Sequence, residues 1–333
     1  MKALTVTLIC LPCFLVVAQT PLFQNEKPIL AKMEISLKDL KKKSNDSTYL
    51  PMSVTYREMA DTPEKTIKGE VRTRGNFRKA NCFFPPMRFK LNKTEGTLFE
   101  KNKNLKLVLP CNAGADGSAL IMKEYLCYRM YERITTHSLH TRLVTLTLTD
   151  TATKSKKSNE LTTFLIEDDD QFAKRLNGKI RKELKLHPRQ FSDTAAVIMD
   201  FFQYMIANTD WSVNAQHNTT VLEYGKKFEA VPYDFDMAGV VNANYAVVSE
   251  SLPITNVKER LYRGFCRKEQ LFQYVRTAYL KMETEILNEI PKLQPYLTPK
   301  ELEGIKKYIT QFFTILKNDN SFKNEIIGNC RTS

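Results

Sequence analysis

The spacing of the apolar residues changes near Glu167, and this change constrains the fold more than any other feature of the sequence. Before it, short stretches alternate between apolar and polar residues, as strands do. These stretches are 66–78, 85–92, 104–110, 141–150 and 160–167, with one helical pattern over 116–135. After it, apolar residues recur at helical spacing over 168–177, 193–208, 268–290 and 298–319, interrupted by a predicted hairpin at 218–236. We therefore predict an α+β protein with a strand-rich first half.

This order of elements predicts a bilobal fold of the atypical protein-kinase-like kind. The β-rich N-lobe is expected over residues 19–166, and the mainly helical C-lobe, which holds the hairpin, over 167–333. A cleft between two such lobes is the place where a nucleotide would bind. Because element order is only an association with a fold, the functional prediction depends on the site residues.

The first residues are typical of a secretory signal. Lys2 provides a positive start, an apolar run follows, and Val16 and Ala18 place small residues before Gln19. We predict that residues 1–18 are removed on export, to the periplasm, the outer envelope or the medium. No later stretch has the length and apolar character of a membrane span.

Composition and cysteine content add weaker constraints. The net charge of +13 favours anionic partners, although a lysine-rich solvated surface explains it equally well. The sequence contains no nucleic-acid-binding signature. Of the seven cysteines, two lie in the predicted signal, which leaves 7 − 2 = 5. An odd number predicts buried thiols rather than a disulfide framework, with a bridge between Cys82 and Cys111 as the alternative.

Two polar clusters carry the functional prediction. An apolar helical pattern ends in Asn-Thr-Asp at 208–210, and the hairpin that follows ends in Asp-Phe-Asp at 234–236. Phosphoryl transfer requires a carboxylate that orients the acceptor hydroxyl and oxygen ligands that hold Mg²⁺ on the phosphates. We assign Asp210 as the catalytic base and Asn218, Asp234 and Asp236 as metal ligands. Asx residues are also common in turns for purely local reasons.

The cation that binds the α- and β-phosphates is expected on a strand of the first half. Lys106 is the first candidate, paired with Glu124 on the following helix, and Lys90 is the competitor one strand earlier. The nucleotide loop is poorly marked, because the Arg-Gly-Asn turn has a single glycine. Arg74 or Arg78 beside this turn could contact phosphate.

These residues resemble a known family. The segments VRTRGNFR, PPMRFKL, LKLVLP, DGSALIMKEYL, ANTDW and VPYDFD are similar to those of the CotH-like, spore-coat-type secreted kinases, and most of all to envelope members from Bacteroidetes-type bacteria. The resemblance covers roughly residues 67–240. It implies an atypical kinase fold, ATP and Mg²⁺ as cofactors, and transfer to a protein Ser. The distance from Asp210 to Asn218 is longer than in the kinase pattern, so Asn214 is an alternative metal ligand.

The predicted function is therefore an extracytoplasmic kinase that transfers the γ-phosphoryl group of ATP to a Ser or Thr hydroxyl of an envelope or surface protein. The alternative is a non-catalytic, pseudokinase-like protein that binds or assembles components of the envelope. Convergence of Asp210 and Asp234 on one cleft together with a cation favours the first function, whereas dispersal of these residues favours the second.

Overall fold

A closed barrel forms the first half of the chain in the computed structural model, which describes residues 20–75, 77–152, 156–182, 184 and 186–332. Its seven strands follow one another in the order β1-β2-β3-β4-β5-β7-β6. They are β1 (Ile29–Ile35), β2 (Leu50–Arg57), β3 (Lys65–Thr73), β4 (Met87–Leu91), β5 (Asn104–Val108), β6 (Thr141–Asp150) and β7 (Ser158–Glu167). The predicted signal, residues 1–18, lies outside the described residues.

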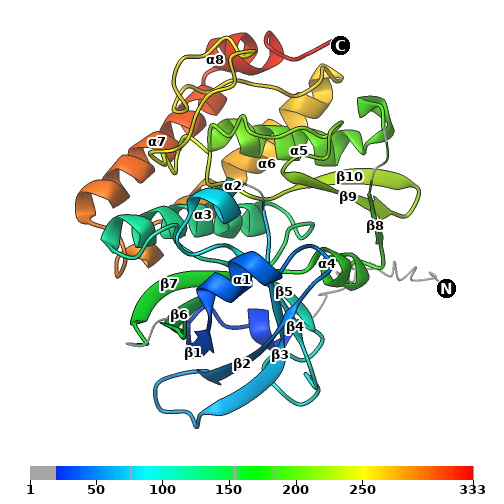
Figure 1. Cartoon of the computed structure of the whole chain (residues 1–333). Helices are drawn as coiled ribbons and strands as arrows, with labels where there is room; N and C mark the ends of the chain where they lie inside the picture. Colours follow the sequence, from blue (N-terminus) through cyan, green and yellow to red (C-terminus); the bar gives the residue numbers. More distant parts are fainter. Residues whose placement is uncertain (1–19, 76, 153–155, 183, 185, 333) are drawn as a thin grey trace, which may run out of the picture.

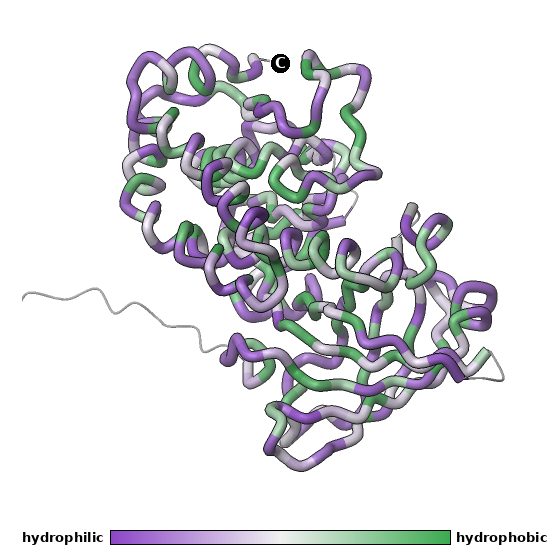
Figure 2. The backbone as a smooth tube through the Cα atoms, turned by 90° about the vertical axis from the view of Figure 1, so that its left-hand side faces the viewer, coloured by the Kyte–Doolittle hydropathy of each residue, from purple (hydrophilic) through white to green (hydrophobic). Residues whose placement is uncertain are grey.

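The barrel closes through a parallel pairing of β1 with β6, in which Ile29 lies opposite Val144 and Ile35 opposite Asp150. The other neighbouring strands pair antiparallel, as β1 does with β2 and β6 with β7. Alternate side chains of each strand point inward, and β1 shows a strict alternation of buried and exposed residues. The same alternation of hydropathy is visible along the barrel strands in Figure 2.

The prediction of a bilobal, protein-kinase-like fold is wrong, because the strand-rich half is this closed seven-stranded barrel. The periodicity of apolar residues is local information, and for that reason it could not predict the barrel. Alternation identifies a strand and its buried face, but it does not specify which strand edges pair. Closure also depends on β1 and β2, which lie in a part of the chain for which no strand was predicted.

Helices are the main regular elements of the second half, and in Figure 1 they lie above the barrel, with α3 between the two parts. A small sheet, with strand order β10-β9-β8, lies beside them. Its strands are β8 (Lys179–Arg181), β9 (Thr219–Tyr224) and β10 (Lys227–Pro232). The helices are α1 (Leu37–Lys43), α2 (Phe77–Asn81), α3 (Ala115–Ile134), α4 (Asp169–Arg175), α5 (Asp193–Met205), α6 (Glu269–Leu287), α7 (Pro299–Lys317) and α8 (Asp319–Phe322).

Two large apolar cores hold these parts together, and a third, smaller cluster lies around Trp211. One fills the barrel, with Val71, Leu91 and Leu105 fully buried. The other lies between α3, β7, α5 and the C-terminal helices, and includes Phe164 and Phe202. Because α3 packs against β7 on one side and against α6 on the other, it joins the barrel to the helices. None of the helices in the described part of the chain combines the length and the apolar character needed to cross a membrane.

Two disulfides correct the prediction of free thiols. Cys82 bonds to Cys111, which was the alternative, and Cys266 bonds to Cys330. Cys127 remains as a buried thiol. The odd number of cysteines did not exclude disulfides, because Cys127 on α3 is a single free thiol beside two complete disulfide pairs. Helix α7 lies within the predicted helical stretch 298–319, and Thr298 is its N-cap in a capping box with Glu301.

His140, which precedes β6, gives a testable pH dependence of stability. Burial, together with the nearby Arg175 and Arg129, lowers the pKa of its imidazole to about 3. The unfolded chain takes up this proton near pH 6.5, whereas the folded chain does not, so stability falls as the pH decreases from 6.5 towards 3. The slope from this one group is about 1.4 kcal/mol per pH unit.

We expect His140→Gln to remove that slope. The difference in unfolding free energy between the parent chain and the variant, measured by urea unfolding between pH 6.5 and 4.5, should change steadily with pH. Because both chains contain the same carboxylates, their contribution to the pH dependence of the unfolding free energy cancels in this difference. A difference that stays constant with pH would show that the imidazole becomes protonated in the folded chain.

Candidate functional site

A cavity of about 500 Å³ gathers most of the predicted site residues. Asp210, Asn218, Asp234 and Asp236 all line it, although 26 residues separate the first of them from the last. Arg74 and Arg78 line it from the barrel side, together with Gly75, which lies between β3 and α2. The remaining lining residues are Pro86, His217, Tyr233 and Met237. The cavity therefore places carboxylates and an amide opposite two guanidinium groups.

The loop after α5 fixes the position of Asp210. The side-chain oxygen of Asn208 accepts a hydrogen bond from the amide of Asp210 at 3.0 Å, and the Trp211 indole donates to the Asn208 carbonyl at 3.1 Å. Ser212 and His217 exchange two backbone hydrogen bonds of 2.9 Å, which close the loop into a tight turn. Because its backbone is held at both ends, the loop presents Asp210 in one orientation.

Asp210 also has two side-chain partners. His217 Nε2 lies 2.9 Å from Asp210 Oδ1, and Asn218 Nδ2 donates to Asp210 Oδ2 at 2.9 Å and to the Asp210 carbonyl at 2.8 Å. These bonds fix the amide nitrogen of Asn218. Its amide oxygen makes no hydrogen bond within the described residues, which leaves it available as an oxygen ligand.

Two of the site residues have a left-handed backbone that non-glycine residues rarely adopt. The φ angle is 51° at Asn218 and 63° at Asp234. The amide of Asp234 donates to the hydroxyl of Tyr128 on α3 at 2.8 Å, so the central helix supports this conformation. Strained backbone of this kind is concentrated at functional sites, where the surrounding structure maintains it.

Burial and like charge make the carboxylates of this site an electrostatic cluster. Burial and the neighbouring Asp234 raise the pKa of Asp236 to about 6, against the opposing effect of Arg78. Burial also raises the pKa of Glu124 well above its usual range, with Asp236 as the next contribution. A cation bound among these groups would relieve their repulsion.

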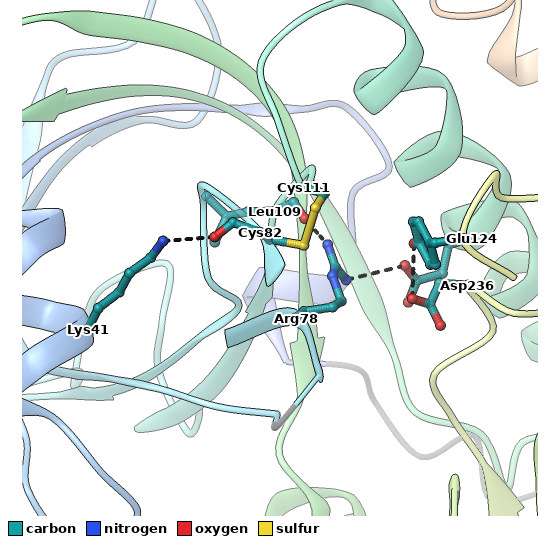
Figure 3. Close-up of a disulfide and its surroundings, with 8 residues drawn as sticks. Lys41, Arg78, Cys82, Leu109, Cys111, Glu124 and Asp236 are labelled. Carbon is teal, nitrogen blue, oxygen red and sulfur yellow. Dashed lines mark hydrogen bonds and ion pairs between the residues drawn. A yellow bond between two sulfur atoms is a disulfide. The ribbon is translucent and has the colours of Figure 1, made fainter. Parts of the chain in front are cut away.

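Arg78 faces this cluster from α2. Its guanidinium donates to the Leu109 carbonyl, and its Nη1 lies 4.0 Å from Glu124 Oε2. Figure 3 shows Arg78 between the Cys82–Cys111 disulfide and the carboxylates of Glu124 and Asp236. Desolvation would lower the pKa of Arg78, but the carboxylates outweigh it and raise the pKa. The disulfide joins the end of α2 to the segment that leads into α3, so it fixes Arg78 relative to Glu124.

The predicted pair of Lys106 and Glu124 does not form. Lys106 Nζ instead lies 2.5 Å from Asp169 Oδ1 and 5.1 Å from the centre of the Tyr233 ring, and Glu124 faces Arg78. Strand register explains this result, because Lys106 lies opposite Ile166 on β7, and the chain after β7 starts α4 with Asp169. A sequence separation of 18 residues allowed the expected pair but could not exclude other acidic partners.

Lys90 and Asn214 lie away from the cavity. Lys90 Nζ pairs with Glu70 Oε2 at 3.1 Å, and both side chains are more than two-fifths exposed on neighbouring strands. Asn214 lies at the far side of the loop and lines a different pocket. Of the two asparagines considered as metal ligands, the cavity therefore contains Asn218.

Several residues that contribute to the site carried no sequence signal. His217, whose Nε2 lies 2.9 Å from Asp210 Oδ1, is a single loop histidine of the kind that is usually only polar surface. Tyr245, whose hydroxyl donates to Asp236 Oδ2 at 3.0 Å, and Arg263, which donates to the carbonyls of Thr209 and Trp211, were not considered. Both come from segments with no recognisable pattern.

The sequence matches no model of a known protein family, and it matches no curated protein.

Proposed function

We propose that the chain is a phosphotransferase that moves the γ-phosphoryl group of ATP to a Ser or Thr hydroxyl of a protein outside the cytoplasm. The observation that carries the proposal is the gathering of Asp210, Asn218, Asp234 and Asp236 with two arginines in one cavity. The resemblance to the CotH-like secreted kinases agrees with these assignments. Two disulfides support a location outside the reducing cytoplasm.

The donor set suits Mg²⁺. Carboxylate and amide oxygens are its preferred protein ligands, and Mg²⁺ is usually held by one or two carboxylates together with substrate phosphates rather than by a complete protein cage. Among the described residues, no group of three or more His, Cys, Asp and Glu side chains is arranged to hold a metal ion. Asp234, Asp236 and Asn218 would therefore share the ion with the nucleotide, and the ion would neutralise charge on the phosphates.

The protein residues then have separate tasks. Arg74 and Arg78 bind the phosphates from the barrel side, with Arg78 held by Leu109 and the disulfide. Asp210 accepts the proton of the acceptor hydroxyl, and His217 and Asn218 keep its carboxylate in position. Phosphoryl transfer needs little more from a protein than such positioning and electrostatic stabilisation.

A non-catalytic nucleotide- or anion-binding protein is the second candidate. One observation favours it: Lys106, the expected phosphate-binding cation, forms an ion pair with Asp169, in which Nζ lies 2.5 Å from Oδ1. A phosphoryl-transfer assay distinguishes the two candidate functions. Incubation of the full chain with radiolabelled ATP, Mg²⁺ and a mixture of envelope proteins should label protein Ser or Thr, and an Asp210→Asn chain should label them about a hundredfold less or lower still. Binding of ATP without any labelled protein would favour the second candidate.

The Cys82–Cys111 bridge gives a prediction with an internal control. Replacing both cysteines by Ser should weaken Mg²⁺-ATP binding roughly tenfold or more, because Arg78 loses its fixed position and a charge-assisted phosphate contact is weakened. Replacing Cys266 and Cys330 removes the other disulfide and should lower the melting temperature while it leaves the Kd unchanged. Equal effects on the Kd, measured by calorimetry, would contradict the role of Arg78.

A further inference from the structure

A second pocket lies on the other side of the loop that holds Asp210. The residues Pro188, Asn214, Phe265, Arg267 and Arg331 line both an outer part of about 460 Å³ and a narrower inner part. We call this pocket the arginine groove. The loop residues divide between the two pockets, because Asp210, His217 and Asn218 line the candidate site, and Trp211 to Asn214 line the arginine groove. A ligand in the groove therefore contacts loop residues that directly follow the proposed base in the sequence.

The outer part of the groove is electropositive. Arg189, Arg267 and Arg331 line it together with His187, and none of the described residues that line this part is acidic. Arg267 is held in place, since its Nε lies 2.6 Å from Asp193 Oδ1 and it donates to the Pro188 carbonyl at 2.8 Å. Arg331 lies 4.2 Å from the centre of the Phe265 ring and follows the disulfide at Cys330. Arg267 and Arg331 are therefore positioned charges, whereas Arg189 is an exposed side chain at the edge of the groove.

The inner part ends at a buried carboxylate that lacks a partner. Asp200 is 7% exposed, and within the described residues it forms no hydrogen bond or ion pair. Arg331 Nε and the Tyr262 hydroxyl are also buried without a hydrogen-bond partner. Gly264 leaves room here, because a Cβ at that position would lie 2.3 Å from Asp200 Oδ2. Buried polar groups of this kind are normally satisfied, so the inner end is suited to a polar group of a ligand.

The protonation of Asp200 is compatible with an anionic ligand nearby. Burial raises the pKa of Asp200 to about 7, and Arg331, Arg267 and Arg263 act in the opposite direction. Near neutral pH a large share of the carboxyl groups is therefore protonated and able to donate a hydrogen bond. Arginine recognises carboxylates and phosphates in a bidentate manner, which suits the outer part to acidic side chains.

Arg263 connects the groove to the loop. It lines the inner part, donates to the Thr209 carbonyl, and donates to the Trp211 carbonyl at 3.0 Å. These two carbonyls flank Asp210 on either side. A ligand that contacts Arg263 would therefore act on the backbone that positions the proposed base.

We propose that the arginine groove binds an acidic segment of the acceptor protein, with carboxylate side chains on Arg189 and Arg331 and a polar uncharged side chain at Asp200. This inference rests on the proposed phosphotransferase function for its biological role, but the binding itself does not require ATP. It identifies the substrate class as proteins whose Ser or Thr lies close in sequence to Asp or Glu.

The test uses a fluorescein-labelled synthetic peptide of Ser, Gly and Asp, and a matched peptide in which each Asp is replaced by Lys. Binding to the full chain is followed by fluorescence anisotropy at low ionic strength. We expect the acidic peptide to bind and the basic peptide not to bind. Added salt should weaken the binding, because the contacts are between charges.

The variant that tests the groove is Arg189→Glu combined with Arg331→Glu. It should weaken binding of the acidic peptide about a hundredfold, because each arginine that no longer bonds a carboxylate lowers the affinity roughly tenfold. The control, Lys226→Glu with Lys227→Glu, makes the same change of charge in the turn after β9 and at the first residue of β10, and should bind as the parent chain does. Arg189→Glu alone, at an exposed position, should give a partial loss if the double variant fails to fold.

Two results would overturn the inference: equal binding of the acidic and basic peptides, or equal binding by the groove variant and the control variant. Failure of the groove is distinguishable from failure of the proposed function. A chain that binds Mg²⁺-ATP but not the acidic peptide refutes the groove alone. A chain that binds the acidic peptide but not Mg²⁺-ATP refutes the phosphotransferase and leaves the groove as a binding site for acidic peptides.

Discussion

Asp234→Asn is expected to abolish Mg²⁺-dependent ATP binding. The variant removes one negative charge from a cavity in which Asp234 and Asp236 are the carboxylates proposed to hold the ion. Mg²⁺ requires hard anionic ligands, and without Asp234 the phosphates would have to be held mainly by Arg74 and Arg78. Calorimetry with ATP in the presence of Mg²⁺ should show a loss of affinity of at least a hundredfold, which corresponds to about 2.7 kcal/mol.

Asparagine is a better replacement than alanine at this position. The φ angle of Asp234 is 63°, a left-handed conformation that Asn tolerates and that strains Ala. The variant therefore removes the charge and preserves the backbone. Asp46→Asn is a suitable control, since Asp46 is almost fully exposed on the barrel and pairs with Arg72. Unchanged Mg²⁺-ATP affinity in Asp234→Asn would contradict the assignment of this residue as a metal ligand.

Asp210→Asn should leave nucleotide affinity close to that of the parent chain and reduce phosphoryl transfer by about 10² to 10⁴-fold, the usual contribution of general-base assistance. Asp210 acts on the acceptor hydroxyl, which is absent when only ATP is bound. Its loss therefore appears in turnover and not in binding. The amide retains an oxygen for the hydrogen bond from Asn218, so the loop is preserved. Radiolabel transfer and calorimetry on the same preparation measure both quantities.

His217→Gln provides the companion measurement. Because His217 Nε2 lies 2.9 Å from Asp210 Oδ1 and the histidine is more than half exposed, its loss should reduce transfer much less than the loss of Asp210 does. Equal loss of ATP affinity in Asp210→Asn and Asp234→Asn would show that Asp210 is a metal ligand or a structural residue.

The sequence predicted the elements of the fold better than their arrangement. The patterns at 85–92, 104–110 and 141–150 correspond to β4, β5 and β6, and the long amphipathic stretches correspond to α6 and α7. The barrel was not predicted, because its closure depends on parallel pairing between Ile29 and Val144 across more than a hundred residues. Local periodicity contains no information about such a contact.

Part of the candidate site was predictable for a different reason. Asp210, Asn218, Asp234 and Asp236 flank a hairpin whose strands pair in register, Thr219 opposite Pro232, so the topology brings them together. The cation that faces Glu124 was not predictable, because it depends on how α2 and β5 lie relative to α3, although Arg74 and Arg78 were candidates for contacting phosphate. Arg78 reaches Glu124 only through α2 and the Cys82–Cys111 bond. The odd number of cysteines favoured free thiols, so this bond was only the alternative.

The proposed function requires that the cavity of about 500 Å³ around Asp210 and Asp234 holds a Mg²⁺-nucleotide. Calorimetric titration of ATP into the full chain, once with Mg²⁺ and once with EDTA, measures this binding. We expect one saturable site with Mg²⁺ and its loss with EDTA. Absence of saturable binding with Mg²⁺, or binding that is equal in EDTA, would contradict the proposed function.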